Sequence, residues 1–411
     1  MKDHQMKLAL VGIGGYGRNH ARTIAGLQQD GLAQCVAYAD VRLDANPDVC
    51  ETLSGLGAAS YTDYKEMLER HPEVDIVVVS TPIPLHVPMC THIMEAGFHV
   101  LLEKPPAVTI QDMNAIADVQ RRTGKRCQVD FQNTSGRAFR ELLRMLDGGA
   151  VGRLQRVTGV GLWKRTWAYY QRTPWAGKLI HGGAYVLDGT VNNALSHLLN
   201  NCLIAAGSGR IPAAVPVAAQ AELYKSIDIE SENTVSARVR TEGGVEVLYY
   251  TTQNHVANDT PYIVAEGDRG SIRWSYDNKL VIREHDQEPR EVAYEAEDLN
   301  RNMYLNLFDA VRGEGELYCP LEACHSFVLA SNGIFESARG IVRIPDAYVG
   351  TRPEGDTEAI ELKDAAALIT QAAEEGLLYA EAGIPWATAT PVFDLTGYTR
   401  FELFREGASP S

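Results

Sequence analysis

The first third of the chain alternates short, continuous apolar runs with stretches of helical spacing. The apolar runs predict strands and lie at residues 7–12, 33–40, 75–80 and 98–102. The amphipathic stretches predict helices and lie at residues 16–29, 62–69, 85–96 and 110–123. Strands without polar alternation are typical of a parallel sheet covered on both faces. We therefore expect a doubly wound Rossmann sheet, an α/β fold, over residues 1–127.

Beyond residue 127 the pattern becomes rich in strands. They are expected at residues 154–163, 218–229, 234–241, 245–253, 261–266, 271–274 and 279–284. The turn pairs Gly243-Gly244 and Asp277-Asn278 predict hairpins between neighbouring strands. One helix is expected at residues 189–200. Residues 128–345 are therefore predicted to form an α+β domain with a large open mixed or antiparallel sheet, which carries the substrate and oligomer contacts.

The last part of the chain returns to helical spacing. We expect helices at residues 321–339 and 361–382, separated by a loop rich in Gly and Pro at residues 349–355. The second helix has a one-sided apolar stripe that includes Leu362, Ala366, Ile369, Ala373 and Leu377. Residues 346–411 are therefore predicted to be a helical extension and tail.

Composition narrows the function classes. The 411 residues are 45% hydrophobic and 22% charged, which is typical of a globular protein. The net charge of −15 disfavours nucleic acid and membrane surfaces as partners, and no apolar run approaches the length of a membrane helix. The seven cysteines form no CxxC pair, and the histidines have no metal-ligand spacing. We expect a cytoplasmic protein with reduced cysteines and no metal site.

A glycine motif, Gly12-Ile-Gly14-Gly-Tyr-Gly17, joins the first predicted strand to the first predicted helix. In this context such a motif binds a dinucleotide, because the glycines allow a tight turn and the helix N-terminus faces the pyrophosphate. Asp40 ends the next strand, where a carboxylate binds the ribose hydroxyls and favours NAD over NADP. Arg42 lies close enough to leave NADP possible.

The tripeptide Glu103-Lys104-Pro105 follows another predicted strand. Ligands of open α/β sheets bind at the carboxyl ends of strands. A lysine there can hydrogen-bond a substrate hydroxyl and stabilise a developing alkoxide.

Together these motifs resemble the Gfo/Idh/MocA family, named after glucose-fructose oxidoreductase and inositol dehydrogenase. The resemblance covers about residues 6–345. It rests on the glycine motif, Thr81-Pro82-x-x-x-His86, Glu103-Lys104-Pro105, Gly182-Gly183 and the segment Glu266-Gly-Asp-Arg-Gly270. It implies an NAD(P)-dependent dehydrogenase that acts on a sugar, inositol or sugar derivative, as a homodimer or homotetramer.

The resemblance also implies a set of cofactor contacts. Ser80, Thr81 and His86 would lie near the ribose and nicotinamide, and Glu103 and Lys104 would border the reacting carbon. Ile13 and Tyr16 are assigned to the cofactor site as members of the glycine loop.

The chain departs from the family at the expected catalytic pair, an Asp followed four residues later by His. Asp188 is present, but Asn192 stands in place of the His; it is a candidate to orient the substrate hydroxyl, although it cannot act as a base near neutral pH. Asn193 and His197 form a second pair four residues apart on one helical face. Three readings follow: His197 replaces the missing base, Asp188 or Lys104 carries the proton chemistry, or the reaction is altered or absent.

Residues 163–175 are dense in aromatic and basic side chains. Trp163, Arg165, Tyr169 and Trp175 are candidates to hold a sugar ring, since aromatic faces stack on its C–H face and guanidinium groups donate to hydroxyls. Asn193 is a further candidate substrate contact. The alternative is an oligomer interface, where the same residue types are enriched.

Three functions remain open from the sequence. The first is a dehydrogenase in which Lys104 polarises a ring hydroxyl. The second keeps NAD tightly bound and cycles through a transient ketone for elimination, epimerisation or glycoside hydrolysis. The third is a nucleotide-binding sensor without turnover.

Overall fold

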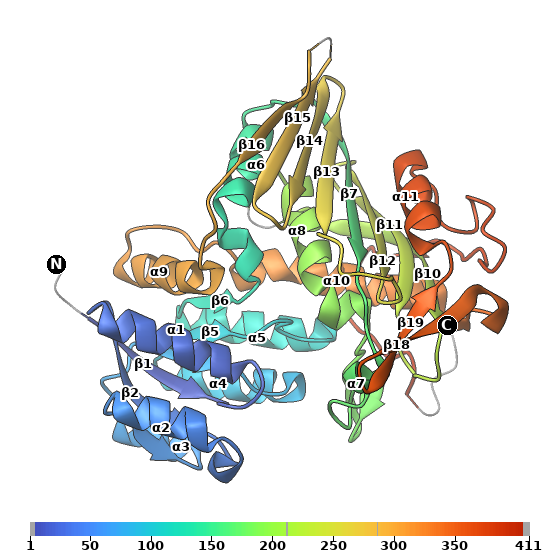
Figure 1. Cartoon of the computed structure of the whole chain (residues 1–411). Helices are drawn as coiled ribbons and strands as arrows, with labels where there is room; N and C mark the ends of the chain where they lie inside the picture. The colour runs from blue at the N-terminus through green and yellow to red at the C-terminus, as the bar shows by residue number, and fades with distance from the viewer. Residues whose placement is uncertain (1–4, 211–212, 286, 406–411) are drawn as a thin grey trace. The chain divides into compact units, whose positions relative to one another are not determined.

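The computed structural model describes residues 5–210, 213–285 and 287–405 (Figure 1). Two compact units divide the chain. The first unit is Met1–Ala107, Asp112–Ser135 and Glu297–Leu321, and the second unit is Val108–Gln111, Gly136–Ala296 and Glu322–Ser411. No helix among the described residues has a stretch long and apolar enough to cross a membrane.

The first unit is built on a parallel sheet of six strands in the order β3-β2-β1-β4-β5-β6. The strands are β1 Met6–Val11, β2 Ala33–Ala39, β3 Ala59–Tyr61, β4 Ile76–Val79, β5 His99–Leu102 and β6 Cys127–Val129. The helices are α1 Gly17–Gln29, α2 Pro47–Gly55, α3 Tyr64–Arg70, α4 His86–Glu95, α5 Ile110–Thr123 and α9 Leu299–Arg312, with short 3-10 turns at Leu43–Ala45, Ile83–Leu85 and Gln132–Ser135.

The core of the first unit joins segments that lie far apart in the sequence. Helix α1 buries Ile24 and Leu27 against the sheet, and α9 returns to the same core with Tyr304, Leu307 and Phe308. Because every strand pair is parallel, the carboxyl ends of the strands lie along one edge, where the loops after β1, β2, β4, β5 and β6 begin.

The second unit contains a mixed sheet of ten strands. Its main path runs β16-β15-β14-β13-β7-β12-β11-β10-β17, and β20 pairs with β10. The strands are β7 Leu154–Leu162, β10 Pro216–Lys225, β11 Thr234–Thr241, β12 Glu246–Thr252, β13 Tyr262–Gly267, β14 Gly270–Ser275, β15 Lys279–Glu284, β16 Arg290–Ala293, β17 Val342–Arg343 and β20 Phe393–Asp394. The pairs β7–β12 and β10–β17 are parallel and the others are antiparallel.

Helices and small hairpins complete this unit. The helices are α6 Arg137–Asp147, α7 Trp167–Tyr170, α8 Ser196–Ala206, α10 Leu321–Ala338 and α11 Ala365–Glu375, with a π-helical turn at Thr190–Ala194 and a 3-10 turn at Asp346–Tyr348. The hairpins are β8 Ile180–His181 with β9 Ala184–Tyr185, and β18 Val349–Glu354 with β19 Thr357–Leu362.

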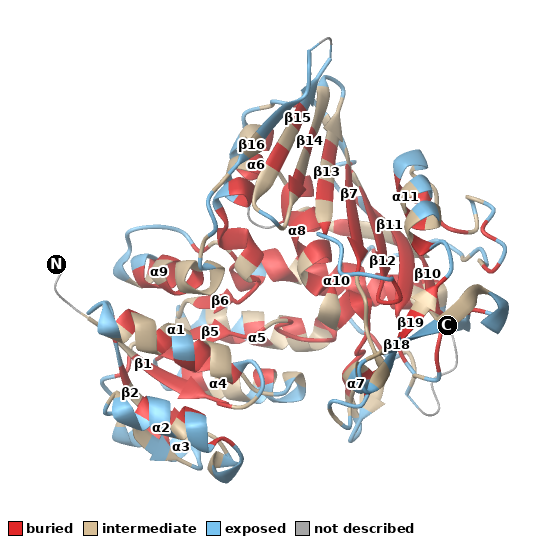
Figure 2. Cartoon of the chain, in the orientation of Figure 1, coloured by how far each residue is buried: buried red, intermediate tan, exposed pale blue. Residues whose placement is uncertain are grey.

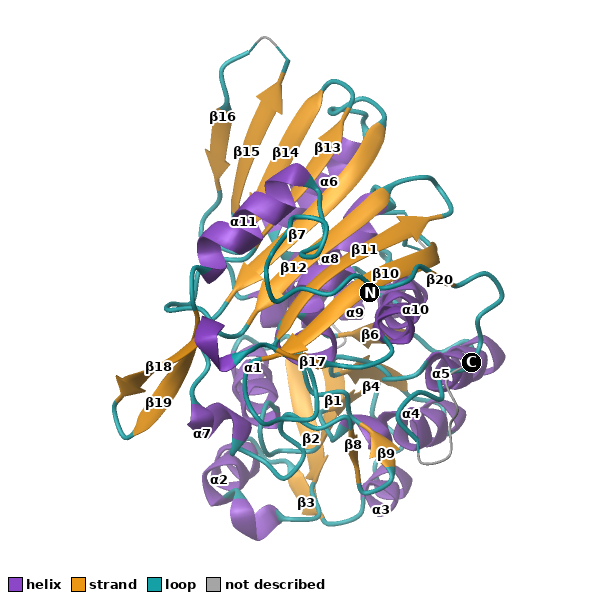
Figure 3. Cartoon of the chain, turned by 90° about the vertical axis from the view of Figure 1, so that its right-hand side faces the viewer, coloured by secondary structure: helices purple, strands orange, loops and turns teal. Residues whose placement is uncertain are grey.

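Both faces of the large sheet are covered near β7. A Cβ added to Gly159 would lie 2.6 Å from the sulfur of Cys202, so α8 packs closely on one face. On the other face, Val160 and Leu162 belong to a core that includes Ile369 of α11. Figure 2 shows β7 and β12 largely buried, and Figure 3 shows α11 lying over the strands. The alternation of side chains along the strand assigns one set to each layer.

The predicted fold class is confirmed, and most predicted strands appear within two residues of their expected bounds. The sequence analysis missed α2, β3, β6, α6 and α9; β3 and β6 have only three residues each. The predicted helix at residues 189–200 is wrong in detail, because a π-helical turn precedes α8.

The expected form of the C-terminal extension is also partly wrong. Residues 349–362 form a hairpin rather than a loop and a helix start, and α11 is shorter than predicted because Gly376 ends it with a positive φ of 70°. The two compact units also differ from the predicted division at residues 127 and 345, since residues 297–321 join the first unit. The division into 1–127, 128–345 and 346–411 stays a prediction.

Candidate functional site

The glycine loop of the first unit follows β1 directly. A Cβ on Gly12 would lie 2.2 Å from the carbonyl oxygen of Ser80, and one on Gly17 would lie 2.2 Å from that of Gly12. These two glycines are therefore needed for the fold itself. At Gly14 the added Cβ would meet nothing nearer than the Asn46 carboxamide at 3.5 Å. The fold therefore leaves space for a side chain at Gly14, and its predicted role in the close approach of a pyrophosphate stays a prediction.

Asp40 stands at the end of β2, beside this loop. Its carboxylate accepts hydrogen bonds from the backbone N–H of Ile13 (2.9 Å) and from that of Arg42 (2.8 Å). The carboxylate thereby fixes the loop and still has lone pairs for a ribose hydroxyl. The Arg42 side chain is exposed, which leaves the NADP alternative open.

Arg18 and Asn46 were missed by the sequence analysis. Arg18, in the first turn of α1, donates to the Asn46 side-chain oxygen (2.9 Å) and forms an ion pair with Asp48. Asn46 in turn lies beside Gly14. A basic residue directly after Gly17, the last glycine of the motif, is the sequence signal that could have identified Arg18 as a candidate phosphate or ribose contact.

His86 is buried between two loops at the carboxyl ends of the strands, and its expected place near the cofactor stays a prediction. Its ring is buried, with Nε2 3.0 Å from the Thr81 carbonyl oxygen and Nδ1 3.0 Å from that of Pro105. Burial lowers the pKa of His86. The imidazole therefore links the loop after β4, which contains Ser80 and Thr81, to the loop after β5.

Glu103 and Lys104 follow β5. Glu103 accepts the backbone N–H of Lys104 (3.0 Å), and its other oxygen lies 3.0 Å from Nε2 of His20. Glu103 is buried, whereas Lys104 is half-buried. Tyr16 completes this neighbourhood: its hydroxyl hydrogen-bonds Asn300, and burial raises its pKa to about 12.

Asp130 follows β6 and is buried next to this pair. Atoms of His20, Glu103 and Asp130 that could bind a metal lie within 4.8 Å of one another. Both ring nitrogens of His20 are already in hydrogen-bonding distance of a partner, Glu103 and Tyr304. The prediction of no metal site stays a prediction.

In the second unit, the aromatic and basic residues of positions 163–175 form one continuous stack. The guanidinium of Arg165 lies 4.8 Å from the ring centres of both Trp163 and Tyr169. The guanidinium of Arg172 lies 3.9 Å from the ring centre of Tyr169 and 5.0 Å from that of Trp175. The four predicted residues are thus brought together, and Arg172, which the sequence did not single out, connects Tyr169 to Trp175.

Asp188 is joined to this stack through Arg172. Its two oxygens accept from the Arg172 guanidinium at 3.1 and 3.0 Å, and one accepts from the backbone of Gly177 (2.8 Å). Asn193 also donates to it through its side chain. The buried carboxylate therefore orients Arg172 and Asn193, two donors that can face a polyhydroxy ligand.

Asn192 is turned away from this group. It is 1% exposed, and its side-chain oxygen accepts from Ser331 at 3.0 Å. The π-helical turn at Thr190–Ala194 sets this orientation and brings Asn193, the next residue, to Asp188. His197 lies half-buried in the first turn of α8.

Glu232 was not predicted. It is fully buried, accepts from the Val191 backbone N–H (3.0 Å) and from Ser231 (2.6 Å), and has its pKa raised by burial to about 7. A Cβ on Gly189 would lie 2.0 Å from its carboxylate, which explains the glycine directly after Asp188.

The hairpin β18–β19 contacts the segment that carries the aromatic and basic stack of residues 163–175. Ile360 is fully buried in a cluster with Tyr170 and Ile227, and Tyr169 packs against that cluster. The Ile360 backbone N–H donates to the Arg165 carbonyl (3.3 Å), and Lys164 pairs with Glu354 (2.6 Å). The C-terminal extension therefore fixes the shape of the predicted substrate segment.

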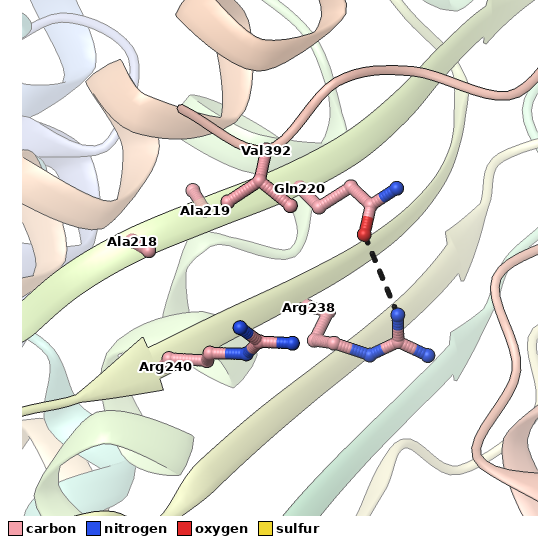
Figure 4. A pocket seen from close by; sticks show the side chains of 6 residues that line it. All are labelled: Ala218, Ala219, Gln220, Arg238, Arg240 and Val392. Atoms are coloured by element: carbon pink, nitrogen blue, oxygen red, sulfur yellow. Dashed lines mark hydrogen bonds between the residues drawn. The ribbon is translucent and has the colours of Figure 1, made fainter. Parts of the chain in front are cut away.

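A small hollow lies elsewhere on the large sheet, at β10 and β11 (Figure 4). Gln220, Arg238, Arg240 and Val392 are among its lining residues. Arg238 already pairs with Glu381 (2.7 Å) and approaches Gln220 (3.5 Å). This arrangement holds strands and tail together, and we assign it no ligand.

Comparison with known proteins agrees with the first unit. Residues 6–131 match the family model described as an oxidoreductase family with an NAD-binding Rossmann fold, which confirms the predicted NAD-binding domain.

Two curated relatives match only part of the chain. A glycosyl hydrolase family 109 protein of Shewanella pealeana is 32% identical over 163 residues, 36% of this chain and 33% of that protein. An inositol 2-dehydrogenase of Azotobacter vinelandii is 30% identical over 148 residues, 36% of this chain and 43% of that protein. The matched part thus spans between a third and a half of these relatives.

Solved structures share the fold over a longer stretch. A levoglucosan dehydrogenase in complex with NADH has a TM-score of 0.68 at 20% identity, over 82% of this chain and 97% of that chain. The WlbA dehydrogenase of Bordetella pertussis, in complex with NADH and UDP-GlcNAcA, has a TM-score of 0.67 at 22% identity, over 82% of this chain and 97% of that chain. At these identities the likeness concerns the fold.

Proposed function

We propose that the chain is an NAD-dependent dehydrogenase oxidising a ring hydroxyl of a sugar, inositol or sugar derivative, because residues 6–131 match the Gfo/Idh/MocA model of an oxidoreductase family with an NAD-binding Rossmann fold. The observation that supports a carbohydrate is the stack of Trp163, Arg165, Tyr169, Arg172 and Trp175. The relatives and structural neighbours include an inositol 2-dehydrogenase, a levoglucosan dehydrogenase and a dehydrogenase in complex with UDP-GlcNAcA.

NAD, when bound, supplies the acceptor for the hydride. The protein's own groups do the remaining work. Gly14 leaves room for the pyrophosphate, and Asp40 accepts from the ribose. Lys104 donates a hydrogen bond to the reacting hydroxyl oxygen and stabilises the negative charge that develops there. NADP stays possible because Arg42 is exposed near the ribose carboxylate.

In the second unit, Asp188 fixes Arg172 and Asn193, and we propose that this group binds hydroxyl or carboxylate groups of a polyhydroxy ligand. Because Asn192 faces Ser331, we do not assign it the proton. As an ammonium at the end of β5, Lys104 donates to the reacting oxygen and does not take up its proton, so Asp188 and His197 stay the candidates for the proton relay.

A second candidate function uses the same groups without net oxidation. NAD would stay bound and support a transient ketone during elimination, epimerisation or glycoside hydrolysis. The absence of a base at residue 192 favours it, as do the relatives named glycosyl hydrolase family 109. A cytoplasmic location and a homodimer or homotetramer belong to both candidates as proposals.

The test is NADH formation, followed by its near-ultraviolet absorbance, with a panel of sugars, inositols, anhydrosugars, glycosides and sugar acids. We expect one compound class to support turnover, and Lys104→Met to lower it by about 10²–10⁴-fold at unchanged NAD affinity. Lys65→Met, at an exposed position on α3, is the matched control and should keep full activity.

The outcomes separate the candidates. Release of a product from glycosides at constant NADH would favour the retained-cofactor function. Full activity of Lys104→Met would contradict both enzymatic candidates, and NAD binding without any turnover would favour a sensor.

A further inference from the structure

A buried group of ionisable side chains lies directly behind Lys104 in the first unit. It consists of His20, Glu103, Asp130 and Tyr304, none of which is more than 8% exposed. Nε2 of His20 lies 3.0 Å from Glu103 and 3.8 Å from Asp130, and Nδ1 lies 2.9 Å from the Tyr304 hydroxyl. We call these four residues the His20 cluster.

The fold explains why these residues meet. Glu103 and Asp130 each follow the last residue of a strand, β5 and β6, and these strands are neighbours in the sheet. The Asp130 backbone N–H donates to the Leu102 carbonyl (2.8 Å), which brings the two carboxyl groups side by side. His20 is one turn along α1 from Gly17, at the same edge of the sheet.

The two carboxyl groups differ in their donors. Glu103 accepts from the Lys104 backbone N–H and lies within hydrogen-bonding distance of His20. Neither oxygen of Asp130 has a hydrogen-bond partner among the described residues. A buried carboxylate without donors is costly to ionise, so Asp130 is the member of the pair that keeps a proton.

The charged neighbours of Asp130 shift its pKa in opposite directions. Burial and the negative charge of Glu103 raise its pKa to about 7, while His20 and Lys104 act in the opposite direction. The pKa of His20 is raised, because its bonds to Glu103 outweigh the effect of burial. Asp298, directly before α9, adds negative charge, and Tyr16, directly before α1, lies against the His20 ring with its own pKa raised by burial.

We propose that Asp130 is a positioning residue for Lys104, which takes up and releases one buried proton and thereby switches the negative charge behind the Lys104 ammonium. Ionised Asp130 stabilises the ammonium that polarises the substrate hydroxyl, and protonated Asp130 withdraws this support. The inference rests on the proposed role of Lys104, but the proton itself is measurable without turnover.

A proton explains the geometry better than a metal ion does. The separation of 3.0 Å between His20 and Glu103 is that of an N–H···O bond, and the Tyr304 hydroxyl occupies the second ring nitrogen. A divalent ion would also meet the positive charge of Lys104, which acts on the same carboxyl group.

The first test is infrared difference spectroscopy of the full chain between about pH 5.5 and about pH 8.5. We expect the C=O band of a protonated carboxyl group to disappear with a midpoint near neutral pH in the wild type. Asp130→Asn removes this contribution. Glu232 is another buried carboxyl group with a raised pKa, so the Asp130 signal is taken from the difference between the wild type and Asp130→Asn.

A second variant tests the cluster if Asp130→Asn folds poorly. Tyr304→Phe removes the hydroxyl bonded to His20 and weakens the imidazolium, so the midpoint of Asp130 should move to higher pH. An unchanged midpoint in Tyr304→Phe would contradict the coupling. Stoichiometric metal in the purified protein that is lost in His20→Gln would overturn the proposal outright.

The third readout is the pH profile of kcat/KM. The ratio of wild type to Asp130→Asn should rise from about one at low pH to roughly tenfold above neutral pH, with unchanged NADH affinity. Glu222→Gln, a buried carboxyl group in the second unit whose oxygens have donors, is the control and should keep the wild-type profile. A constant ratio across pH would refute the switch.

These readouts separate the two proposals. A carboxyl group that titrates without any NAD-linked turnover would refute the proposed function alone. Turnover without a titrating Asp130 would refute this inference alone.

Discussion

Asp130 and Asp188 are two almost fully buried carboxyl groups with opposite surroundings. Asp130, in the first unit, is 1% exposed and has no hydrogen-bond donor among the described residues. Asp188, in the second unit, is 5% exposed and accepts from Arg172, Gly177 and Asn193. Two carboxyl groups of similar burial therefore have different roles. Asp130 is proposed to exchange a proton, whereas Asp188 holds Arg172 and Asn193 in place.

Hydrogen-bond donors, rather than the degree of burial, therefore decide whether a buried carboxyl group is ionised. A charge removed from water needs replacement hydrogen bonds, and the guanidinium of Arg172 supplies two of them to Asp188. At Asp130 the His20 imidazole is 3.8 Å away and lies closer to Glu103, at 3.0 Å. Each of the following substitutions changes one of the two units and leaves the other unchanged.

The largest effect is expected for Arg172→Met. It leaves Asp188 buried without its main partner, and loss of one member of a buried pair costs about 3–5 kcal/mol. Partial exposure of the Arg172 side chain places the result at the lower end of that range. Urea unfolding followed by tryptophan fluorescence measures it. Arg144→Met, which breaks an exposed pair with Glu141, is the control and should leave the midpoint unchanged.

The next effect concerns pH and Asp130→Asn. The folded-state pKa of Asp130, about 7, lies above the unfolded value, so the contribution of this residue to stability is complete at low pH and is lost as pH rises through 7. Relative to the wild type, the variant should therefore gain about 2 kcal/mol between about pH 5.5 and about pH 8. Unfolding at a series of pH values measures the gain. A pH-independent difference would contradict the raised pKa.

A smaller effect is expected for Asn192→Ala. The substitution removes the acceptor of Ser331 in a buried site and should cost about 1–2 kcal/mol, with turnover within a few-fold of the wild type. Activity assays and thermal unfolding are measured on the same preparation. A hundredfold loss of turnover would show that Asn192 takes part in the reaction.

The smallest effect is expected for Ile360→Val in the β18–β19 hairpin. Deleting one buried methylene should cost about 0.5–1.5 kcal/mol. Since Ile360 supports the stack through Tyr170, substrate KM should rise while NADH affinity stays constant. An equal loss of both affinities would indicate general destabilisation instead.

Much of the fold followed from hydrophobic patterning. The buried β4 and the strands β11 and β15 were predicted because their apolar runs are continuous or cleanly alternate. The hairpin β18–β19 was missed because Pro353 and Gly355 indicated a loop. Its pairing depends on contacts with residues 164–168, which lie almost 200 positions earlier and leave no local signal.

Candidate site residues could be predicted from the sequence where a motif directly follows a predicted strand. The glycine loop, Asp40 and Lys104 were singled out because each adjoins a predicted strand, and their roles stay predictions. Asp130 and His20 were not, because their importance arises only when β5, β6 and α1 converge. The orientation of Asn192 depends on a π-helical turn, whose extra residue per turn no periodicity argument anticipates.

The central claim, that the loop after β1 receives NAD, is tested most directly by calorimetric titration of NADH into the wild type and Gly14→Val. The fold tolerates a small side chain at this position, so both proteins should unfold at similar temperatures. The account predicts one NADH per wild-type chain and binding at least tenfold weaker, by about 1.4 kcal/mol or more, in Gly14→Val. Equal NADH affinity in the two proteins, or none in the wild type, would contradict it.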